Sequence, residues 1–418
     1  MSPPPVLLTF DHGTVVIPRL PAEADALRGL LTEDPRTGRL RAPGRAYRAL
    51  VLGLRAAGVP YRDEARRFAP LDLAVRGDLE PFPHQQEALS AWRDAGRLGV
   101  VEMPTGAGKT VLGALALADA GRPGLVVVPT IELLHQWRRT LEDLLGVEVG
   151  VIGGGEKERR DITVITYDSA ALQVEFLGHR FGCLVFDEVH HLPSPAYRFI
   201  AEGSIAPFRI GLSATVTRPD GAEKAIFQSV GPLVHQVGIE ALEGDYLAPY
   251  EVVTVPVALD PEEAHAYDEA REEYLSFVRS QGIRFSRPGG WADFIMRAHQ
   301  SDAGRSAFRA YRRQRRIALA SRAKVEALWT ILKRHREDRV LVFTEDNETV
   351  YRLSRTFLLP ALTHQTRPAE RKALLEGFAD GSLRVLVTAK VLNEGEVLFP
   401  CLVVGVGFLR VQRHRHRD

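Results

Sequence analysis

Residues 103–110 have the sequence Met103-Pro104-Thr105-Gly106-Ala107-Gly108-Lys109-Thr110, which is the strongest local signal in the chain. An apolar run before it, Gly99 to Met103, predicts a strand, and Thr110 to Ala120 predicts a buried helix after it. A glycine-rich turn that ends in Gly-Lys-Thr between a strand and a helix is typical of a phosphate-binding loop. The strict pattern has glycine where Met103 stands, so the alternative is a glycine-rich turn that binds nothing.

The residue types in this loop indicate how a nucleoside triphosphate would be held. Gly106 and Gly108 let backbone N–H groups approach phosphate oxygens, and the helix N-terminus adds a favourable dipole. Lys109 would neutralise charge on the β- and γ-phosphates, and Thr110 would ligate Mg²⁺. The residues expected to bind the nucleotide are Thr105, Gly106, Ala107, Gly108, Lys109 and Thr110.

A second pattern, Phe186-Asp187-Glu188-Val189-His190-His191, places two carboxylates at the end of an apolar strand. Asp187 is expected to hold Mg²⁺, and Glu188 to orient and deprotonate an attacking water molecule. Ligand-binding groups of open α/β sheets lie at the carboxyl ends of strands, where both patterns are expected to meet. Together they predict a nucleoside triphosphatase with Lys109, Asp187 and Glu188 as catalytic residues. The alternatives are a zinc site at the adjacent histidines and an exposed acidic turn.

Around these patterns, apolar runs alternate with helix-period segments from about residue 80 to residue 250. This alternation predicts βαβ units and a parallel sheet, so the fold class is α/β. The further strands expected are Leu125 to Val128, Ile162 to Thr166, Cys183 to Phe186 and Arg209 to Leu212.

The rest of the chain divides by its patterning. Val6 to Phe10 and Thr14 to Ile17 predict two strands about a turn, and Arg45 to Ala57 predicts a short helix, which together indicate a small α+β module. The α/β rhythm resumes after a charged, helical insert, with strands predicted at Arg339 to Phe343 and Arg384 to Thr388. The expected domains are 1–75, 76–250, 251–322 and 323–418.

The composition excludes several classes of protein. With 418 residues, 45% of them hydrophobic, the chain is expected to form several packed domains. A net charge of +1 leaves nucleic-acid binding to local patches. Cys183 and Cys401 cannot build a disulfide framework or a multi-thiolate metal site. The sequence shows no signal peptide and no membrane-spanning run, so we expect a soluble, cytoplasmic protein without a membrane partner.

Four arginines of the insert are spaced four, three and four residues apart, which places them on one face of a helix. With Phe308 and Tyr311 beside it, such a stripe could follow a phosphodiester backbone while an aromatic ring stacks on a base. The alternative is a solvated helix face whose aromatic residues pack. The four are Arg305, Arg309, Arg312 and Arg316.

Six further elements, in chain order, resemble motifs of superfamily 2 helicases. They are the glutamine motif at Pro83 to Leu89, motif Ia at Val128 to Trp137, a TYxS element at Thr166 to Ala170, motif III at Gly211 to Thr215, motif IV at Arg339 to Thr344 and the start of motif V at Val391 to Gly395. Asp187-Glu188-Val189-His190, with Leu7 to Ile17 and Asp34 to Arg39, narrows the resemblance to the XPB family, as found in shorter prokaryotic members. The resemblance covers about residues 5 to 395.

This resemblance implies two RecA-like domains, the second incomplete, with a damage-recognition module at the N-terminus and a thumb-like insert. It implies an ATP- and Mg²⁺-dependent DNA helicase or translocase of 3′→5′ polarity, linked to nucleotide excision repair. Single-stranded or forked DNA would be the substrate, with a nuclease or repair protein as a candidate partner.

By the same resemblance, Gln85 matches the family's adenine-reading glutamine, and Thr130 and Gln136 match positions near the DNA backbone. The alternatives are a surface amide at Gln85 and a capping or packing role at Gln136. The motif that couples hydrolysis to DNA movement, with a Ser/Thr pair at a strand end as its alternative, falls on Ser213, Ala214 and Thr215.

The sequence departs from the family after Gly395, where Glu396-Val397-Leu398-Phe399 replaces the expected valine–aspartate continuation. In the Arg/His-rich tail, Arg415 and His416 stand where the family's arginine motif has glycine and its first finger arginine. One hypothesis is a shifted reading frame near residue 395, and the other is a shortened member whose arginine comes from a partner. The rival functions are a double-stranded DNA translocase or restriction-type motor subunit, and a remnant that binds ATP and DNA without turnover.

Overall fold

The computed structural model describes residues 5–77, 79–217, 221–238, 240–242, 253–285, 287, 289–389 and 402–406. The chain divides into two compact units, Met1–Tyr250 and Glu251–Asp418. The motif V segment, the sequence departure that follows it and the Arg/His-rich tail lie outside the described residues. Within the part of the chain that the structure describes, no helix has the length and apolar character needed to cross a bilayer.

The N-terminal part of the first unit contains β1 (Val6–Asp11), β2 (Thr14–Ile17), 3₁₀ helix η1 (Ala22–Leu30), β3 (Thr32–Asp34), β4 (Arg39–Pro43), α1 (Tyr47–Ala56) and β5 (Tyr61–Asp63). The strands form one sheet of order β3-β4-β2-β1-β5, with α1 packed on it. The β1–β2 hairpin turns at His12 and Gly13, whose φ angles are 45° and 81°. Such a turn matches the twist of paired strands, and glycine adopts it without strain. The two strands and the helix predicted in this module are confirmed.

The large sheet of the first unit has the order β13-β6-β12-β11-β7-β10-β8-β9. Neighbouring strands are parallel except for the antiparallel β8–β9 edge. The strands are β6 (Leu98–Glu102), β7 (Gly124–Val128), β8 (Val149–Gly153), β9 (Glu156–Glu158), β10 (Ile162–Thr166), β11 (Cys183–Asp187), β12 (Phe208–Ser213) and β13 (Leu233–Gln236). All five strands predicted for this sheet are confirmed.

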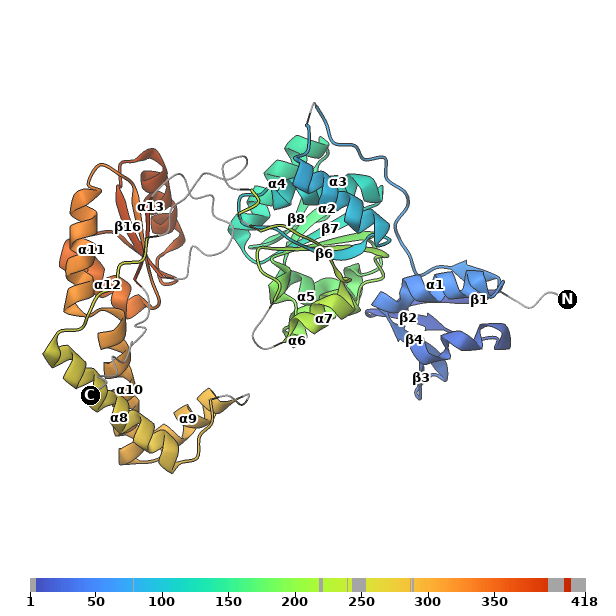
Figure 1. Ribbon diagram of the computed structural model, residues 1–418. Helices are drawn as coiled ribbons and strands as arrows, with labels where there is room; N and C mark the ends of the chain where they lie inside the picture. Colours follow the sequence, from blue (N-terminus) through green and yellow to red (C-terminus); the bar gives the residue numbers. More distant parts are fainter. Residues whose placement is uncertain are drawn as a thin grey trace. The chain divides into compact units, whose positions relative to one another are not determined.

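Helices cover both faces of the large sheet (Figure 1), which explains why its central strands are continuous apolar runs. One face carries α2 (Pro83–Asp94), α3 (Lys109–Ala120) and α4 (Ile131–Leu145). The other carries α5 (Tyr167–Leu177), α6 (Pro195–Glu202) and α7 (Glu223–Ser229). Strands β6 and β11 both pair with β12 and run parallel to it. The chain segments that leave β6 and β11 therefore emerge at the same edge of the sheet.

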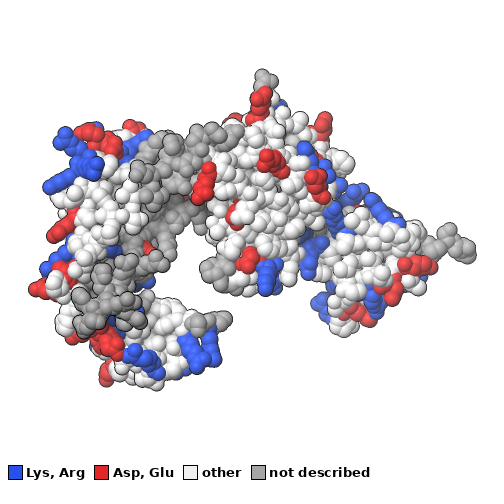
Figure 2. All heavy atoms as spheres, in the orientation of Figure 1, with Lys and Arg blue, Asp and Glu red and all other residues white. Residues whose placement is uncertain are grey.

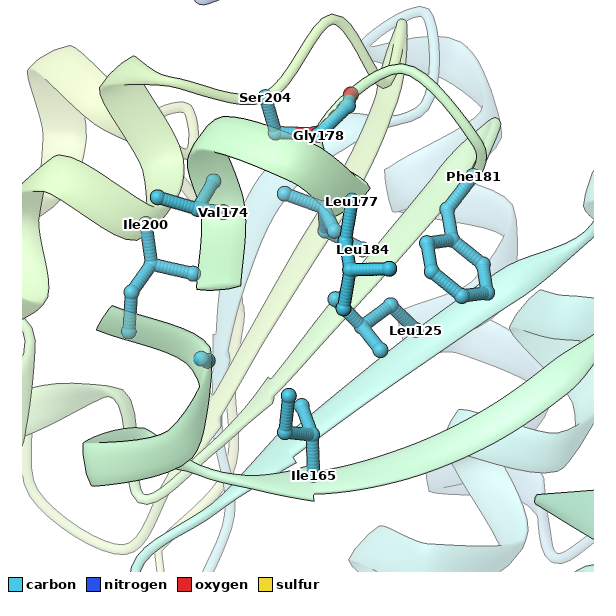
Figure 3. A pocket seen from close by; sticks show the side chains of 10 residues that line it. Leu125, Ile165, Val174, Leu177, Gly178, Phe181, Leu184, Ile200 and Ser204 are labelled. Carbon is cyan, nitrogen blue, oxygen red and sulfur yellow. Dashed lines mark hydrogen bonds between the residues drawn. The ribbon is translucent and has the colours of Figure 1, made fainter. Parts of the chain in front are cut away.

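The core between the large sheet and α5 contains a small cavity (Figure 3), with a volume of about 10 Å³. Its walls are mostly apolar side chains, including Leu125, Ile165, Leu177 and Phe181. A water molecule needs roughly 10–15 Å³ and several polar partners. This cavity is therefore a packing gap and not a ligand site.

Lys and Arg side chains gather where the N-terminal module meets the large sheet (Figure 2). Three guanidinium groups, from Arg48, Arg97 and Arg122, lie 5.9, 5.3 and 4.3 Å from the centre of the Phe208 ring. Arg48 comes from α1 and also donates to two carbonyl oxygens of the large-sheet domain, at 2.7 and 3.0 Å. Cation–π contacts and hydrogen bonds thus hold the module against the sheet.

The second unit contains α8 (Pro261–Ser280), α9 (Gly290–His299), α10 (Asp302–Leu319), α11 (Arg322–Arg334), β14 (Val340–Thr344), α12 (Asn347–Phe357), β15 (Ala361–Leu362), α13 (Pro368–Asp380), β16 (Val385–Thr388) and β17 (Leu402–Val406). The first three helices pack on one another as an arm, which confirms the predicted helical insert. The strands form a parallel sheet of order β15-β16-β14-β17. Both strands predicted here are confirmed with small shifts at their ends.

Candidate active site

The glycine-rich stretch forms a loop between β6 and α3, at the carboxyl edge of the large sheet. Gly106 and Gly108 have φ angles of 86° and 80°, a left-handed region in which other residues are strained. A Cβ atom at Gly108 would lie 2.2 Å from Nε2 of Gln85, so a side chain does not fit there. Helix α3 begins at Lys109, and no side chain of the described residues caps its N-terminus. Uncapped amides at a helix N-terminus suit an anion such as phosphate.

Gln85 of α2 shapes this loop. Its Oε1 accepts a hydrogen bond from the backbone N of Phe82 at 3.0 Å, and its Nε2 lies 3.3 Å from the carbonyl oxygens of both Ala107 and Gly108. The residue is 2% exposed. The alternative of a surface amide is therefore wrong, because both ends of the buried amide bond to the protein.

Lys109 connects the loop to the end of β11. Its Nζ lies 3.2 Å from Oε1 of Glu188, and the two side chains are 11% and 9% exposed. Beyond this ion pair, the buried ammonium nitrogen finds no hydrogen-bond partner among the described residues. An ammonium group has three donors, so Lys109 keeps the capacity to bind a second anion. The structure thus brings together the two patterns singled out in the sequence.

Asp187 is buried and accepts two hydrogen bonds. The indole Nε1 of Trp137 donates to its Oδ2 at 2.7 Å, and the backbone N of Glu188 donates to its Oδ1 at 3.1 Å. Burial, together with the neighbouring charge of Glu188, raises the pKa of the Asp187 carboxyl. Each carboxylate oxygen has a second lone pair, so Asp187 can still ligate a cation.

Glu188 has a φ of 45°, which is uncommon for a residue with a side chain and is typical of strained functional sites. Burial opposes ionisation of its carboxyl, but the hydrogen bond to His190 and the ammonium of Lys109 outweigh burial and lower its pKa. The group is therefore charged at neutral pH and points its two oxygens at different partners, Oε1 at Lys109 and Oε2 at Ser213.

Ser213 ends β12 and is buried beside Glu188. Its Oγ lies 3.3 Å from Oε2 of Glu188 and 2.9 Å from Nδ1 of His190, and it accepts from the backbone N of Thr215 at 3.3 Å. Thr215 is exposed, and Ala214 between them is half-buried. A polar network thus runs from the carboxylate to the surface at the strand end.

Of the two adjacent histidines, His190 belongs to this polar network and His191 packs near an aromatic ring of the core. His190 contacts Ser213, and the ring of His191 lies 5.9 Å from that of Tyr167. The described residues hold no group of three His, Cys, Asp or Glu that could bind a metal ion. The zinc alternative is therefore wrong for the described part of the chain.

Helix α4 begins at a capping threonine. Oγ1 of Thr130 accepts from the backbone N of Leu133 at 3.2 Å, so Thr130 caps the helix, and Gln136 is half-buried. The residue that the sequence analysis missed is Trp137, which is fully buried. A buried indole needs an acceptor for its N–H. A tryptophan on the apolar face of a predicted helix therefore indicates a nearby hydrogen-bond acceptor, although not which residue supplies it.

The insert's arginine stripe lies on α10, and all four side chains are exposed. Arg305 contacts Asp302, and Arg312 lies 3.3 Å from Glu348. Phe308 and Tyr311 are half-buried and belong to the core of the arm, so packing accounts for both rings. Within the described residues, no ion pair or hydrogen bond engages the guanidinium groups of the other two arginines, Arg309 and Arg316.

Three family models match the chain. Residues 8–65 match the xeroderma pigmentosum group B helicase damage recognition domain, and residues 78–218 match the res subunit of type III restriction enzymes. Residues 323–398 match the helicase conserved C-terminal domain. The matched segments follow one another along the chain and leave residues 219–322, which include the helical arm, unmatched.

Two curated proteins are similar over most of the chain. The DNA 3'-5' translocase XPB2 of Sulfurisphaera tokodaii is 36% identical over 381 residues, which cover 88% of this chain and 85% of that protein. The DNA 3'-5' helicase XPB of Mycobacterium tuberculosis is 29% identical over 347 residues, which cover 77% of this chain. The match spans 56% of the mycobacterial protein, so this chain corresponds to little more than half of its length.

Proposed function

The chain belongs to the XPB family of helicases, and on that premise we propose that it is an ATP-dependent DNA helicase or translocase that uses Mg-ATP hydrolysis to move on or open DNA. The observation that carries this proposal is the buried pair of Lys109 and Glu188, 3.2 Å apart at the carboxyl edge of a parallel sheet. A loop lysine and a strand-end carboxylate in this position are the parts that an ATP-hydrolysing site needs.

The loop from Thr105 to Thr110 would receive the triphosphate. Gly106 and Gly108 leave the backbone open to phosphate oxygens, and the uncapped start of α3 adds its N–H groups. Lys109 would turn from Glu188 toward the β- and γ-phosphates. Gln85 would hold the conformation of the loop through its hydrogen bonds to the carbonyl oxygens of Ala107 and Gly108. The base of the nucleotide would lie near Gln85.

Thr110 and Asp187 would hold Mg²⁺. The donor set fits this ion, since Mg²⁺ is commonly bound by one or two carboxylates with water and substrate phosphates as its other ligands. Held there, Mg²⁺ would supply positive charge against the negative charge that develops on the phosphate oxygens. Trp137 would fix the orientation of Asp187 through the hydrogen bond to Oδ2.

Glu188 would act as the general base for water. Once Lys109 pairs with phosphate, the Glu188 carboxylate loses one of the partners that lower its pKa and becomes a stronger base. It would take a proton from the water that attacks the γ-phosphorus, while the bond to the bridging oxygen breaks and ADP leaves. Ser213 and His190 hold Oε2, so the carboxylate keeps its orientation during this step.

Movement on DNA would be coupled to hydrolysis through Ser213, Ala214 and Thr215, which link Glu188 to an exposed strand end. Single-stranded or forked DNA is the expected substrate, in DNA repair, with a nuclease or repair protein as partner. The location that we propose is the cytoplasm, as expected from the sequence. The candidate contacts to the DNA backbone are Thr130, Arg305, Arg309, Arg312 and Arg316.

Steady-state ATP hydrolysis with and without single-stranded DNA tests this proposal. The wild-type chain should hydrolyse ATP faster with DNA, whereas Lys109→Ala and Glu188→Gln should each reduce the rate by at least about a hundredfold, the scale of lost acid–base catalysis. A wild-type rate equal to that of both variants would instead support a remnant without turnover.

A second candidate is a motor that moves along duplex DNA without separating its strands. The match of residues 78–218 to the res subunit of restriction enzymes favours it, because the two kinds of motor share an ATPase core. Displacement of the third strand of a triplex, without displacement of a strand from a forked duplex, would identify this function.

A further inference from the structure

A groove lies between the helical arm and the start of α12, within the second unit. Its cavity has a volume of about 320 Å³, within the roughly 300–1,000 Å³ of small-molecule sites. We call it the insert groove and define it by six of its lining residues: Trp291, Tyr311, Arg312, Arg316, Asp346 and Glu348.

Trp291 is an exposed aromatic residue on a rigid support. Its ring lies 5.0 Å from that of Tyr311 and 5.3 Å from that of the buried Phe294, between ring centres. Nevertheless 45% of its surface is exposed. A large aromatic side chain that is held by other rings and still open to solvent is suited to stack on a planar group.

Among the described residues that line the groove, the guanidinium group of Arg316 has no acidic partner. Arg312 pairs with Glu348 at 3.3 Å, and Arg315 lies 3.4 Å from Glu345 and 3.8 Å from Asp346. The groove's acidic residues thus have arginine partners. The side chain of Arg316 is exposed and makes no ion pair or hydrogen bond with the residues that the structure describes. It therefore remains available to a phosphate group.

The Arg312–Glu348 pair can open at little cost. Its two side chains are 65% and 57% exposed, and pairs so open to solvent contribute little to stability. Arg315, by contrast, is half-buried and also close to the hydroxyl of Tyr311, at 3.4 Å, so it stays in place. A phosphate that approaches Arg316 can thus recruit Arg312 by displacing Glu348.

We infer that the insert groove binds one unstacked nucleotide of single-stranded DNA. The base stacks on Trp291, and the adjoining phosphate is held by Arg316 and Arg312. A duplex hides the faces of its bases, so the groove selects single strands. This inference rests on the proposed function for its choice of DNA, and it assigns to the helical arm a base-binding site in addition to the backbone contacts of the arginine stripe.

Fluorescence anisotropy of a labelled oligothymidylate, without ATP, tests the site. Trp291→Ala should weaken binding by about tenfold, within the range of one lost base stack, while Trp291→Phe should keep most of the affinity. Trp329→Ala is the matched control, since Trp329 is 44% exposed and stacks on Phe357 of the same unit. Equal affinities of the Trp291→Ala and Trp329→Ala variants would overturn the inference, as would an equal loss for a blunt duplex.

Charge can be tested on the same helix. Arg316→Gln should weaken binding and reduce the slope of log affinity against log salt by about one. Arg313→Gln, which removes an arginine of α10 that is paired with Glu269, should leave that slope unchanged. Identical slopes for the two variants would contradict a phosphate contact at Arg316.

Intrinsic fluorescence gives an independent readout. Trp92 and Trp137 are fully buried, so DNA in the insert groove should quench Trp291. Quenching should be lost in Trp291→Phe and kept in Trp329→Phe, and the reverse pattern would contradict the site. If the chain hydrolyses ATP but the Trp291 and Arg316 variants behave like their controls, the proposed function stands and the nucleotide site in the insert groove is contradicted. If the variants differ from their controls as predicted but the chain does not hydrolyse ATP, the nucleotide site stands and the proposed function is contradicted.

Discussion

The indole N–H of Trp137 donates to Oδ2 of Asp187 across 2.7 Å, and both residues are buried. This bond joins helix α4 to the end of β11, because Trp137 lies in the helix and Asp187 is the last residue of the strand. A shift of α4 would therefore move, or remove a hydrogen bond from, the carboxylate that we propose as a Mg²⁺ ligand. Trp137 is thus a positioning residue, which acts through Asp187.

Trp137→Phe should raise the Mg²⁺ concentration that gives half-maximal ATP hydrolysis by several-fold. The substitution keeps an aromatic ring but leaves a buried carboxylate oxygen without its donor, at a cost of about 1–3 kcal/mol. The measurement is a Mg²⁺ titration of the hydrolysis rate. Trp92→Phe is the matched control, since Trp92 is equally buried and donates to the carbonyl oxygen of Arg209 at 2.8 Å. The same Mg²⁺ shift in both variants would attribute the effect to general loosening of the core.

Gly108→Ala should abolish most nucleotide binding. The backbone there has a φ of 80°, and the new Cβ atom would lie 2.2 Å from Nε2 of Gln85, so the loop must distort. We expect at least a tenfold loss of affinity for ATP, measured by calorimetry. Gly58→Ala is the matched control. The backbone at Gly58 has a similar φ of 65°, but none of the described atoms lies within 4 Å of the Cβ atom that the substitution adds. If Gly58→Ala weakened ATP binding as much, the loop contact would not be the cause.

Acid should weaken the first unit through His179. Burial, aided by the charges of Arg180 and Arg67, lowers the pKa of this imidazole to about 4. Its ring lies 4.7 Å from that of Phe10 of the N-terminal module, between ring centres. The folded state thus binds fewer protons than the unfolded state, whose histidine has a pKa near 6.5. The stability due to His179 is therefore complete above pH 6.5 and is lost as the pH falls toward 4.

Thermal unfolding between pH 7 and pH 4.5 measures this loss. The midpoint should fall less steeply with pH in His179→Gln than in the wild-type chain. His265→Gln replaces an exposed histidine of the second unit and should follow the wild-type curve. Parallel curves for His179→Gln and the wild type would show that this imidazole has no part in the acid response.

Sequence patterns predicted most of the large-sheet strands whose residues are buried on both sides, although β8 is equally buried and was not predicted. Ile162 to Thr166 is a strand because five consecutive residues, all of them β-branched, are covered by helices on both faces. The exposed edge strand from Glu156 to Glu158 escaped prediction, since charged side chains do not favour a strand and pairing with β8 alone creates it. Local signals therefore identify the centre of a sheet better than its edges.

The same distinction applies to the candidate site. The glycine loop and the Asp187–Glu188 pair are local patterns, so the sequence predicted both of them and their meeting point at the sheet edge. The contact between Trp137 and Asp187 joins residues that are far apart in sequence, and no local pattern encodes such a partner. Thr130 has a structural role besides the DNA contact that the sequence predicts, because its hydroxyl caps helix α4.

Calorimetric titration of the purified chain with ATP, in the presence and absence of Mg²⁺, measures whether the loop around Lys109 binds the nucleotide. We predict saturable binding of ATP that depends on Mg²⁺ in the wild-type chain and is at least about a hundredfold weaker in Lys109→Ala, the loss expected when a buried charge contact of about 3 kcal/mol is removed. Binding that is absent in the wild type, indifferent to Mg²⁺, or unchanged in Lys109→Ala would contradict the account.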